Sequence, residues 1–125
     1  MIVSIGIDIV EVYRIAETLA RTPRFGERVF TDAERTYCEA KGAAAPQSYA
    51  GRFAAKEAFL KALQTGWRGK ITWRDIEILS NDQGVPELNI SGEAAELFKN
   101  SGATQMHLCI SHTSEHAVAQ VIFEK

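Results

Sequence analysis

The sequence has few cysteines, little net charge and no long apolar run. Its two cysteines, Cys38 and Cys109, form no spaced metal-binding pattern, and so small a number favours a reducing cytoplasm. The formal net charge is only −2, which does not indicate a nucleic-acid-binding protein. No apolar run approaches the ~20 residues that span a bilayer, and the residues after Met1 lack the basic region of a signal peptide. These absences predict a cytoplasmic protein with neither a nucleic-acid nor a membrane partner.

Common catalytic motifs are absent as well. The sequence has no P-loop, no G-x-G-x-x-G, no C-x-x-C and no H-E-x-x-H, and Ser111-His112 lacks a nucleophile elbow. Neither Cys38 nor Cys109 has an obvious activating neighbour, so we interpret both as structural thiols. If the protein binds phosphate groups, side chains rather than a glycine-rich loop must hold them.

The length and the hydrophobic pattern predict one domain, spanning residues 1–125. The composition, 46% apolar and 24% charged, is typical of a soluble globular protein. Periodicity and turn signals predict strands at 2–10, 75–79, 85–90, 106–111 and 117–123, and helices at 11–21, 31–41, 47–65 and 91–100. Trp67 and Gly69 suggest a covering loop after the third helix. This order predicts a compact α+β domain with helices on one side of a largely antiparallel sheet.

The stretch from Gly51 to Leu63 contains the strongest helical pattern together with several charged side chains. Glu57 and Lys61 lie one turn apart, where a solvated pair contributes only ~0.3–0.5 kcal/mol to helix stability. On spacing alone, a solvated pair is the ordinary interpretation. A functional role for these residues depends on what the rest of the chain places near them.

The first strand carries an unusual acidic residue. Its alternation places Ile5, Ile7 and Ile9 on one face and Ser4, Gly6 and Asp8 on the other. Aspartate is depleted in strands, and an ionised carboxylate is costly beside an apolar sheet. Asp8 is therefore either a solvent-facing residue of an edge strand or a carboxylate that binds a ligand near the strand's end.

Three arginines form a predicted basic patch in a chain of negative net charge. Arg14 and Arg21 are seven residues apart on one helical face, and Arg24 follows just beyond Pro23. Such charges usually belong to a solvated surface, and the alternative is a docking site for an acidic partner.

The remaining chemical candidates are two carboxylates and several cations, namely Asp8, Glu57, Arg52, Lys56, Lys61 and His112. Two carboxylates suit Mg²⁺, which completes its octahedral coordination with phosphate oxygens and water. The cations suit a phosphorylated substrate, so the set indicates phosphoryl transfer or pyrophosphate cleavage.

Four segments together resemble the holo-[acyl-carrier-protein] synthases, the small single-module type of 4'-phosphopantetheinyl transferase. They are Gly6-Ile7-Asp8-Ile9-Val10-Glu11, Arg14-Ile15, Arg52-Phe53-Ala54-Ala55-Lys56-Glu57-Ala58 with Lys61, and Ser111-His112-Thr113. The resemblance covers essentially the whole chain, including the turn at Asn81-Asp82-Gln83-Gly84-Val85-Pro86.

The resemblance implies transfer of the phosphopantetheine arm from coenzyme A to a serine of an apo acyl carrier protein, with release of adenosine 3',5'-bisphosphate. It implies that Asp8, Glu57 and Lys61 are catalytic. In this interpretation Asp8 and Glu57 bind Mg²⁺, while Lys61 contacts the coenzyme A phosphates. The serine proton passes to a metal-bound water, to Asp8 or to Glu57.

The resemblance also assigns the binding surfaces. Arg52 and His112 are expected to meet the phosphates of the adenosine part of coenzyme A. The basic patch, Arg14, Arg21 and Arg24, is expected to face the acidic carrier protein. A homotrimer with each active site at a subunit interface is implied as well.

Two other functions compete with this one. A non-catalytic module that binds a carrier protein or nucleotide would not need both Asp8 and Glu57. A Mg²⁺-dependent hydrolase of small pyrophosphates would have no use for the arginine patch. Both alternatives therefore leave part of the pattern unexplained.

Overall fold

The computed structural model describes residues 1–65 and 70–125, so the loop predicted around Trp67 and Gly69 lies outside the described residues. The elements are β1 (Ile2–Glu11), α1 (Val12–Arg21), α2 (Pro23–Val29), α3 (Asp32–Glu39), α4 (Ala45–Leu63), β2 (Ile76–Ser80), β3 (Pro86–Ile90), α5 (Gly92–Asn100), β4 (Gln105–His112) and β5 (His116–Glu124). Short 3₁₀ turns at Gly42–Ala44 and Trp73–Asp75 precede α4 and β2. Within the described part of the chain, no helix is both long and apolar enough to cross a membrane.

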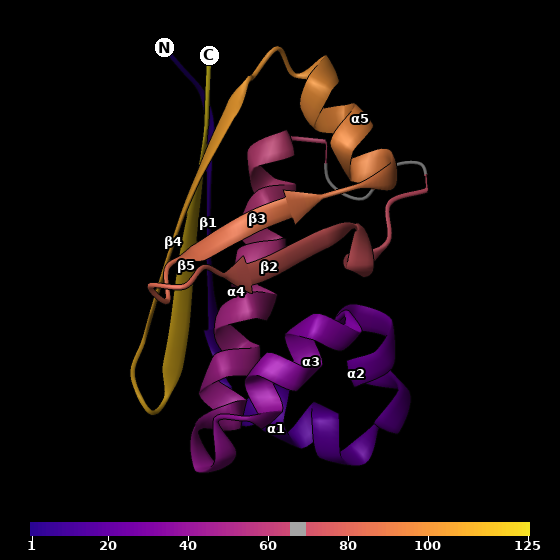
Figure 1. The fold of residues 1–125 in the computed structure, drawn as a ribbon, viewed down its shortest axis with the longest axis vertical. Coiled ribbons are helices and arrows are strands. Elements are labelled where there is room, and N and C mark those ends of the chain that lie inside the picture. Colours follow the sequence, from indigo (N-terminus) through magenta and orange to yellow (C-terminus); the bar gives the residue numbers. More distant parts are fainter. Residues whose placement is uncertain (66–69) are drawn as a thin grey trace.

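The strands form two antiparallel sheets. One sheet has the order β1-β5-β4, and β2 and β3 form a separate hairpin. Figure 1 shows the long sheet along one side of the molecule, α4 beside it, and α1, α2 and α3 gathered at one end. The two termini meet at the other end, where the Met1 amino group donates to the Lys125 carbonyl at 2.7 Å. The predicted α+β fold is confirmed, with its antiparallel strands divided between two sheets.

The small side chains of β1 face α4. The Ser4 hydroxyl donates to the Ala62 carbonyl at 2.6 Å. A methyl group added at Gly6 would collide with the Ala58 carbonyl and lie 2.6 Å from the Ala62 amide nitrogen. The helix therefore approaches the strand backbone as closely as glycine permits.

The apolar face of β1 points away from the helices. Ile5, Ile7 and Ile9 are 50%, 55% and 65% exposed. Because successive strand side chains alternate, the face that packs against α4 carries Gly6 and Asp8. Asp8 thus lies on an edge strand, as one interpretation held, but it faces the helix rather than open solvent.

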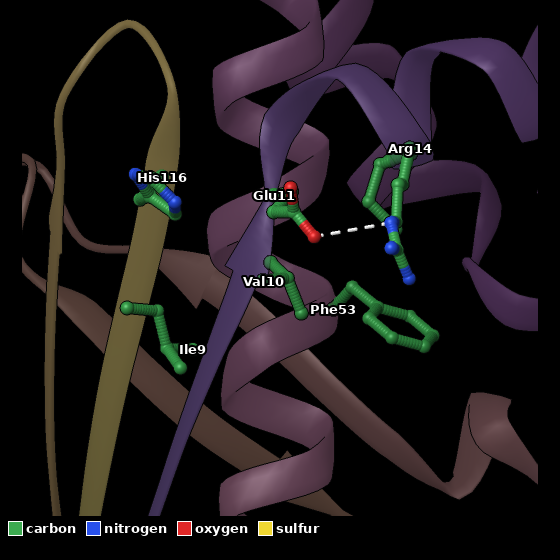
Figure 2. Close-up of a pocket in the computed structure, with 7 residues that line it drawn as sticks. Ile9, Val10, Glu11, Arg14, Phe53 and His116 are labelled. Atoms are coloured by element: carbon green, nitrogen blue, oxygen red, sulfur yellow. Dashed lines mark ion pairs between the residues drawn. The ribbon is translucent and has the colours of Figure 1, made fainter.

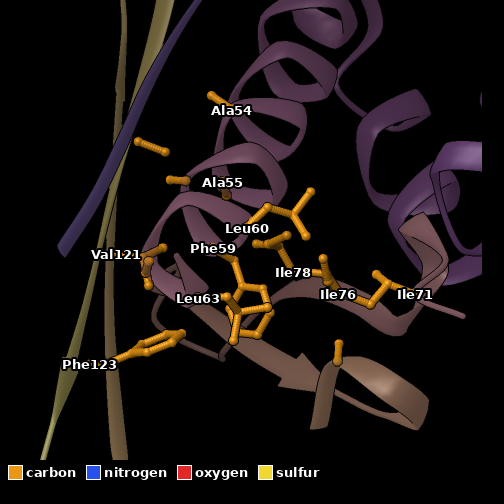
Figure 3. Close-up of a cluster of buried hydrophobic side chains, with 14 of the residues drawn as sticks. Ala54, Ala55, Phe59, Leu60, Leu63, Ile71, Ile76, Ile78, Val121 and Phe123 are labelled. Carbon is orange, nitrogen blue, oxygen red and sulfur yellow. The ribbon is translucent and has the colours of Figure 1, made fainter. Parts of the chain in front are cut away.

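Helix α4 is the centre of the main core. Its Ala54, Ala55 and Ala58 are fully buried, and Phe59 stacks edge-on against Phe123 of β5 with ring centres 5.4 Å apart. Figure 3 shows these side chains filling the space between the sheet, α4 and the hairpin strand β2. A helix covered on so many sides can hold its few polar residues in fixed positions.

Two helix boundaries differ from the sequence prediction because of prolines. Helix α4 begins at Ala45 rather than at Gln47, since Pro46 occupies its first turn instead of closing the linker. Helix α2 was not predicted, and it begins at Pro23. The capping box predicted at Thr31 is confirmed, because the Thr31 and Glu34 side chains each accept from the other's backbone amide.

Candidate active site

Asp8, Glu57 and Lys61 meet where β1 packs against α4. The Lys61 ammonium lies 2.9 Å from Asp8 Oδ1 and donates to the Ile7 carbonyl at 3.0 Å. Burial raises the pKa of the Glu57 carboxyl, the nearby Asp8 charge raises it further, and Lys61 lowers it. Among the described residues, Lys61 therefore pairs across to the strand and not with Glu57 along the helix. The solvated-pair interpretation is wrong for Lys61.

The oxygen donors of this cluster fit a magnesium ion. Asp8 and Glu57 place two carboxylates close enough for one charge to raise the pKa of the other. No group of three or more histidine, cysteine, aspartate or glutamate side chains in the described residues is placed to hold a metal. A Mg²⁺ here would take two carboxylates from the protein and complete its shell with water and phosphate oxygens, the usual arrangement at phosphate-processing sites.

Lys56, the neighbouring candidate cation, does not belong to this cluster. Its side chain is fully buried and forms an ion pair of 2.8 Å with the equally buried Glu34. It also donates to the carbonyls of Trp73 and Ile76, at 3.0 and 2.6 Å. Burial lowers the pKa of Lys56, and the Glu34 charge opposes that shift. Lys56 joins α4 to α3 and β2, so its role is structural.

Arg52 and His112 line a hollow of about 270 Å³ that does not include the acidic cluster. Arg52 is only 5% exposed, and its guanidinium lies 4.0 Å from the centre of the Tyr37 ring. Its terminal nitrogens donate to the hydroxyls of Ser48 and Ser80 at 3.4 and 3.2 Å. Within residues 1–65 and 70–125, Arg52 has no carboxylate partner, and its buried Nε has no hydrogen-bond acceptor. A buried cation without a countercharge favours binding of an anion.

Sequence reasoning missed the other residues that surround Arg52 in this hollow. Tyr37 comes from α3, Ser48 from α4 and Ser80 from β2. The hydrogen bond with Ser80 lowers the pKa of Tyr37, and Lys41 and Arg52 contribute in the same direction. No local motif marks these residues, because they become neighbours only through packing between distant segments.

The two groups of predicted site residues lie at opposite edges of the long sheet. Asp8 is on β1, His112 ends β4, and β5 lies between these strands. With ~4.8 Å between neighbouring strands, the two edges are about 10 Å apart. Arg52 and Glu57 are also separated by about 140° around α4, since each helical residue turns ~100°. The chain thus brings Asp8, Glu57 and Lys61 together, and separately Arg52 and His112.

The arginine patch follows α1 and continues onto α2. Arg14 pairs with Glu11 at 3.0 Å and Arg21 with Glu17 at 3.1 Å, and both arginine side chains are 70% exposed. Arg24 is exposed on α2. Pairs this exposed contribute little stability, so an incoming carboxylate can replace the glutamates at small cost.

An apolar pocket of about 420 Å³ lies beside Arg14 of the arginine patch. Figure 2 shows Phe53 of α4, Ile9 and Val10 of β1, and Arg14 bound to Glu11 around it. Phe53 precedes Glu57 by one helical turn, and Ile9 follows Asp8 directly. The pocket is therefore lined by Arg14 of the patch and by residues that are close in sequence to Asp8 and Glu57.

Comparison with known proteins identifies the family. Residues 4–121 match the model of the 4'-phosphopantetheinyl transferase superfamily. The chain is 47% identical to the holo-[acyl-carrier-protein] synthase of Koribacter versatilis, over 99% of each chain. It superposes with a TM-score of 0.86 on the holo-[acyl-carrier-protein] synthase of Neisseria meningitidis, at 34% identity and 100% coverage of both chains.

A third relative was solved with a ligand. The holo-(acyl-carrier-protein) synthase of Bacillus anthracis, in complex with CoA (3',5'-ADP), matches at a TM-score of 0.80 and 43% identity, covering 99% of this chain and 97% of that one. The family model spans nearly the whole sequence, and the fold agrees with that of the solved relatives. The chain belongs to the 4'-phosphopantetheinyl transferase superfamily.

Proposed function

We propose that this protein is a holo-[acyl-carrier-protein] synthase, which transfers 4'-phosphopantetheine from coenzyme A to a serine of apo acyl carrier protein. The observation that carries the proposal is the meeting of Asp8, Glu57 and Lys61 at the junction of β1 and α4, in a chain of this superfamily. Its relatives bear that enzyme's name, and one of them binds CoA (3',5'-ADP). The cytoplasm suits the two free thiols, Cys38 and Cys109.

The reaction exchanges the phosphoanhydride bond of coenzyme A for a phosphoester bond to serine. The serine oxygen bonds to the phosphorus that carries the pantetheine arm, and the bond from that phosphorus to the bridging oxygen breaks. Adenosine 3',5'-bisphosphate leaves with the bridging oxygen, and the serine proton passes to Asp8 or Glu57, directly or through water. The Lys61 ammonium, which lies beside Asp8, is proposed to contact the pyrophosphate and to neutralise the charge that develops on the leaving group. When bound by Asp8 and Glu57, Mg²⁺ would add a second, stronger neutralising charge.

Arg52 and His112 supply the binding site for the phosphates of the adenosine part. The favourable feature is the buried Arg52 guanidinium, which is held by hydroxyls and by the Tyr37 ring rather than by a carboxylate. A phosphate group satisfies both the missing countercharge and the unpaired Nε.

A homotrimer accounts for the separation between the two halves of the site. Asp8 and His112 lie at opposite sheet edges, so a neighbouring copy would set its Arg52–His112 hollow against the acidic cluster of the first. The exposed isoleucine face of β1, formed by Ile5, Ile7 and Ile9, provides apolar surface for such an assembly.

The carrier protein is assigned to the arginine patch. Arg14 lines the apolar pocket, Arg21 lies beside Arg14 on α1, and Arg24 extends the positive charge onto α2. An acidic helix bearing the modified serine would bind there by charge complementarity.

Mass spectrometry tests the proposal directly. Apo acyl carrier protein is incubated with coenzyme A, Mg²⁺ and this protein, and a carrier whose acceptor serine is replaced by alanine serves as the control. A mass gain of one phosphopantetheine on the serine carrier alone supports the transferase. Cleavage of coenzyme A without a gain on the carrier would instead favour the hydrolase, and an unchanged mixture would favour the binding module.

A further inference from the structure

Lys61 is bound to one oxygen of Asp8, one of the two carboxylates that would hold a divalent cation at this site. Its ammonium lies 2.9 Å from Asp8 Oδ1 and is held a second time by the Ile7 carbonyl at 3.0 Å. The Asp8 side chain is only 15% exposed, so few other directions of approach remain open to an ion. The Lys61 side chain is 55% exposed, which leaves room for it to swing away from β1.

We propose that Lys61 competes with the divalent cation for Asp8, and that the pyrophosphate of coenzyme A relieves this competition by drawing the ammonium away. The inference rests on the proposed function for the identity of the cation and of the phosphate ligand. When an ammonium and a divalent ion share a single carboxylate, the two cations lie close together. Their repulsion weakens the binding of each cation to the carboxylate. A phosphate oxygen gives the ammonium another strong acceptor.

Competition at Asp8 makes the metal and coenzyme A bind cooperatively. The ligand that removes Lys61 from Asp8 raises the affinity of the site for the cation, and by linkage the cation raises the affinity for that ligand. Without substrate the site holds the metal weakly. The full set of charges assembles only when the pyrophosphate is present.

A purely structural role for Lys61 predicts the opposite result. If the side chain only tethers α4 to β1 and keeps Asp8 oriented, its removal loosens the carboxylate and weakens metal binding. The sign of the change in metal affinity therefore separates the two roles.

The test measures Mn²⁺ binding by electron paramagnetic resonance of the free ion, on full-length protein without coenzyme A. Lys61→Met removes the charge and keeps most of the side-chain length, and Lys61→Arg keeps the charge. Lys99→Met is the matched control, because it removes one exposed lysine charge on α5, away from the cluster. We expect Lys61→Met to bind Mn²⁺ about three- to tenfold more tightly than Lys99→Met, from the strength of exposed ion pairs and of charge repulsion at this range. Lys61→Arg should bind it as the wild type does.

The change in coenzyme A affinity provides a second test. In calorimetry with EDTA, Lys61→Met should bind coenzyme A several-fold more weakly than Lys99→Met, because the phosphate loses a cation. Mn²⁺ affinity of Lys61→Met equal to or below that of Lys99→Met overturns the inference, as does the lack of Mn²⁺ binding by every variant. Failure of the proposed function has a different signature, since the carrier protein would then gain no mass while the two affinity changes persisted.

Discussion

Replacing Glu57 by glutamine should abolish transfer and leave the protein folded. The Glu57 side chain lies near both Asp8 and Lys61 and supplies one of the two carboxylates of the cluster. Glutamine keeps the shape and removes the charge, so a cation would lose half of its protein ligands. Loss of a preorganised electrostatic contact of this kind typically costs 10²- to 10³-fold in rate. We expect a decrease in kcat of at least about 10²-fold.

The same substitution should stabilise the fold at neutral pH. Burial raises the pKa of Glu57 above its ordinary value, Asp8 adds to the rise and Lys61 opposes it. A raised pKa in the folded state means that stability falls as the pH rises through the interval between the unfolded and folded pKa values. Above that interval the ionised carboxylate lowers the free energy of unfolding, and glutamine removes this cost. The gain should therefore be present near neutrality and vanish at pH values below about 4.

The assay combines turnover and thermal melting on the same preparations. Transfer is followed by the mass of the carrier protein, and melting is followed by circular dichroism in EDTA at several pH values. Glu96→Gln is the control, because it removes an exposed carboxylate on α5. Near-normal turnover of folded Glu57→Gln would refute the metal assignment. A melting temperature below that of the wild type at neutral pH would refute the electrostatic account of the cluster.

Three further outcomes follow from the site and the surfaces. Lys61→Ala should strongly lower the rate of transfer and change the melting temperature little. A large decrease in the melting temperature that accompanies the loss of activity would instead support a structural role for Lys61. Light scattering should report about three times the 13.8 kDa chain mass. A fully active monomer would contradict an active site that is shared between subunits. Arg14→Glu combined with Arg21→Glu should raise KM for the carrier protein and leave coenzyme A affinity nearly unchanged. Transfer by the wild type should weaken with salt, which screens exposed charges over ~8–10 Å, and the double variant should respond less.

Most of the secondary structure could be predicted from local patterns. The alternation in β4 is confirmed, since Met106, Leu108 and Ile110 pack against the core and their neighbours are exposed. The capping box at Thr31 fixed the start of α3. Helix α2 was not predicted, and it begins at Pro23 because proline is suited to the first turn of a helix.

The site was predictable only where it depends on neighbouring residues or on the family motif. The motif placed Asp8, Glu57 and Lys61 together, and the structure does the same. It gave no indication that Lys56 would be buried against Glu34, because that partner is 22 residues away on another helix. The surroundings of Arg52 were likewise beyond sequence reasoning, since they come from three separate elements.

The packing of β1 explains why a carboxylate on a strand reaches the active site at all. Ser4 contacts Ala62 and Gly6 contacts Ala58, so the strand and α4 run in opposite directions, and their backbones approach most closely at Gly6. Side chains two residues apart share a strand face, which puts Asp8 on the helix side. Helical side chains tilt toward the N-terminus of their helix, which carries the Lys61 ammonium toward Asp8. The same alternation leaves the large isoleucines of β1 on the outer face. The alternation of β1 thus places Asp8 on the face toward α4 and the exposed isoleucines on the other, and Gly6 allows the close approach of the helix.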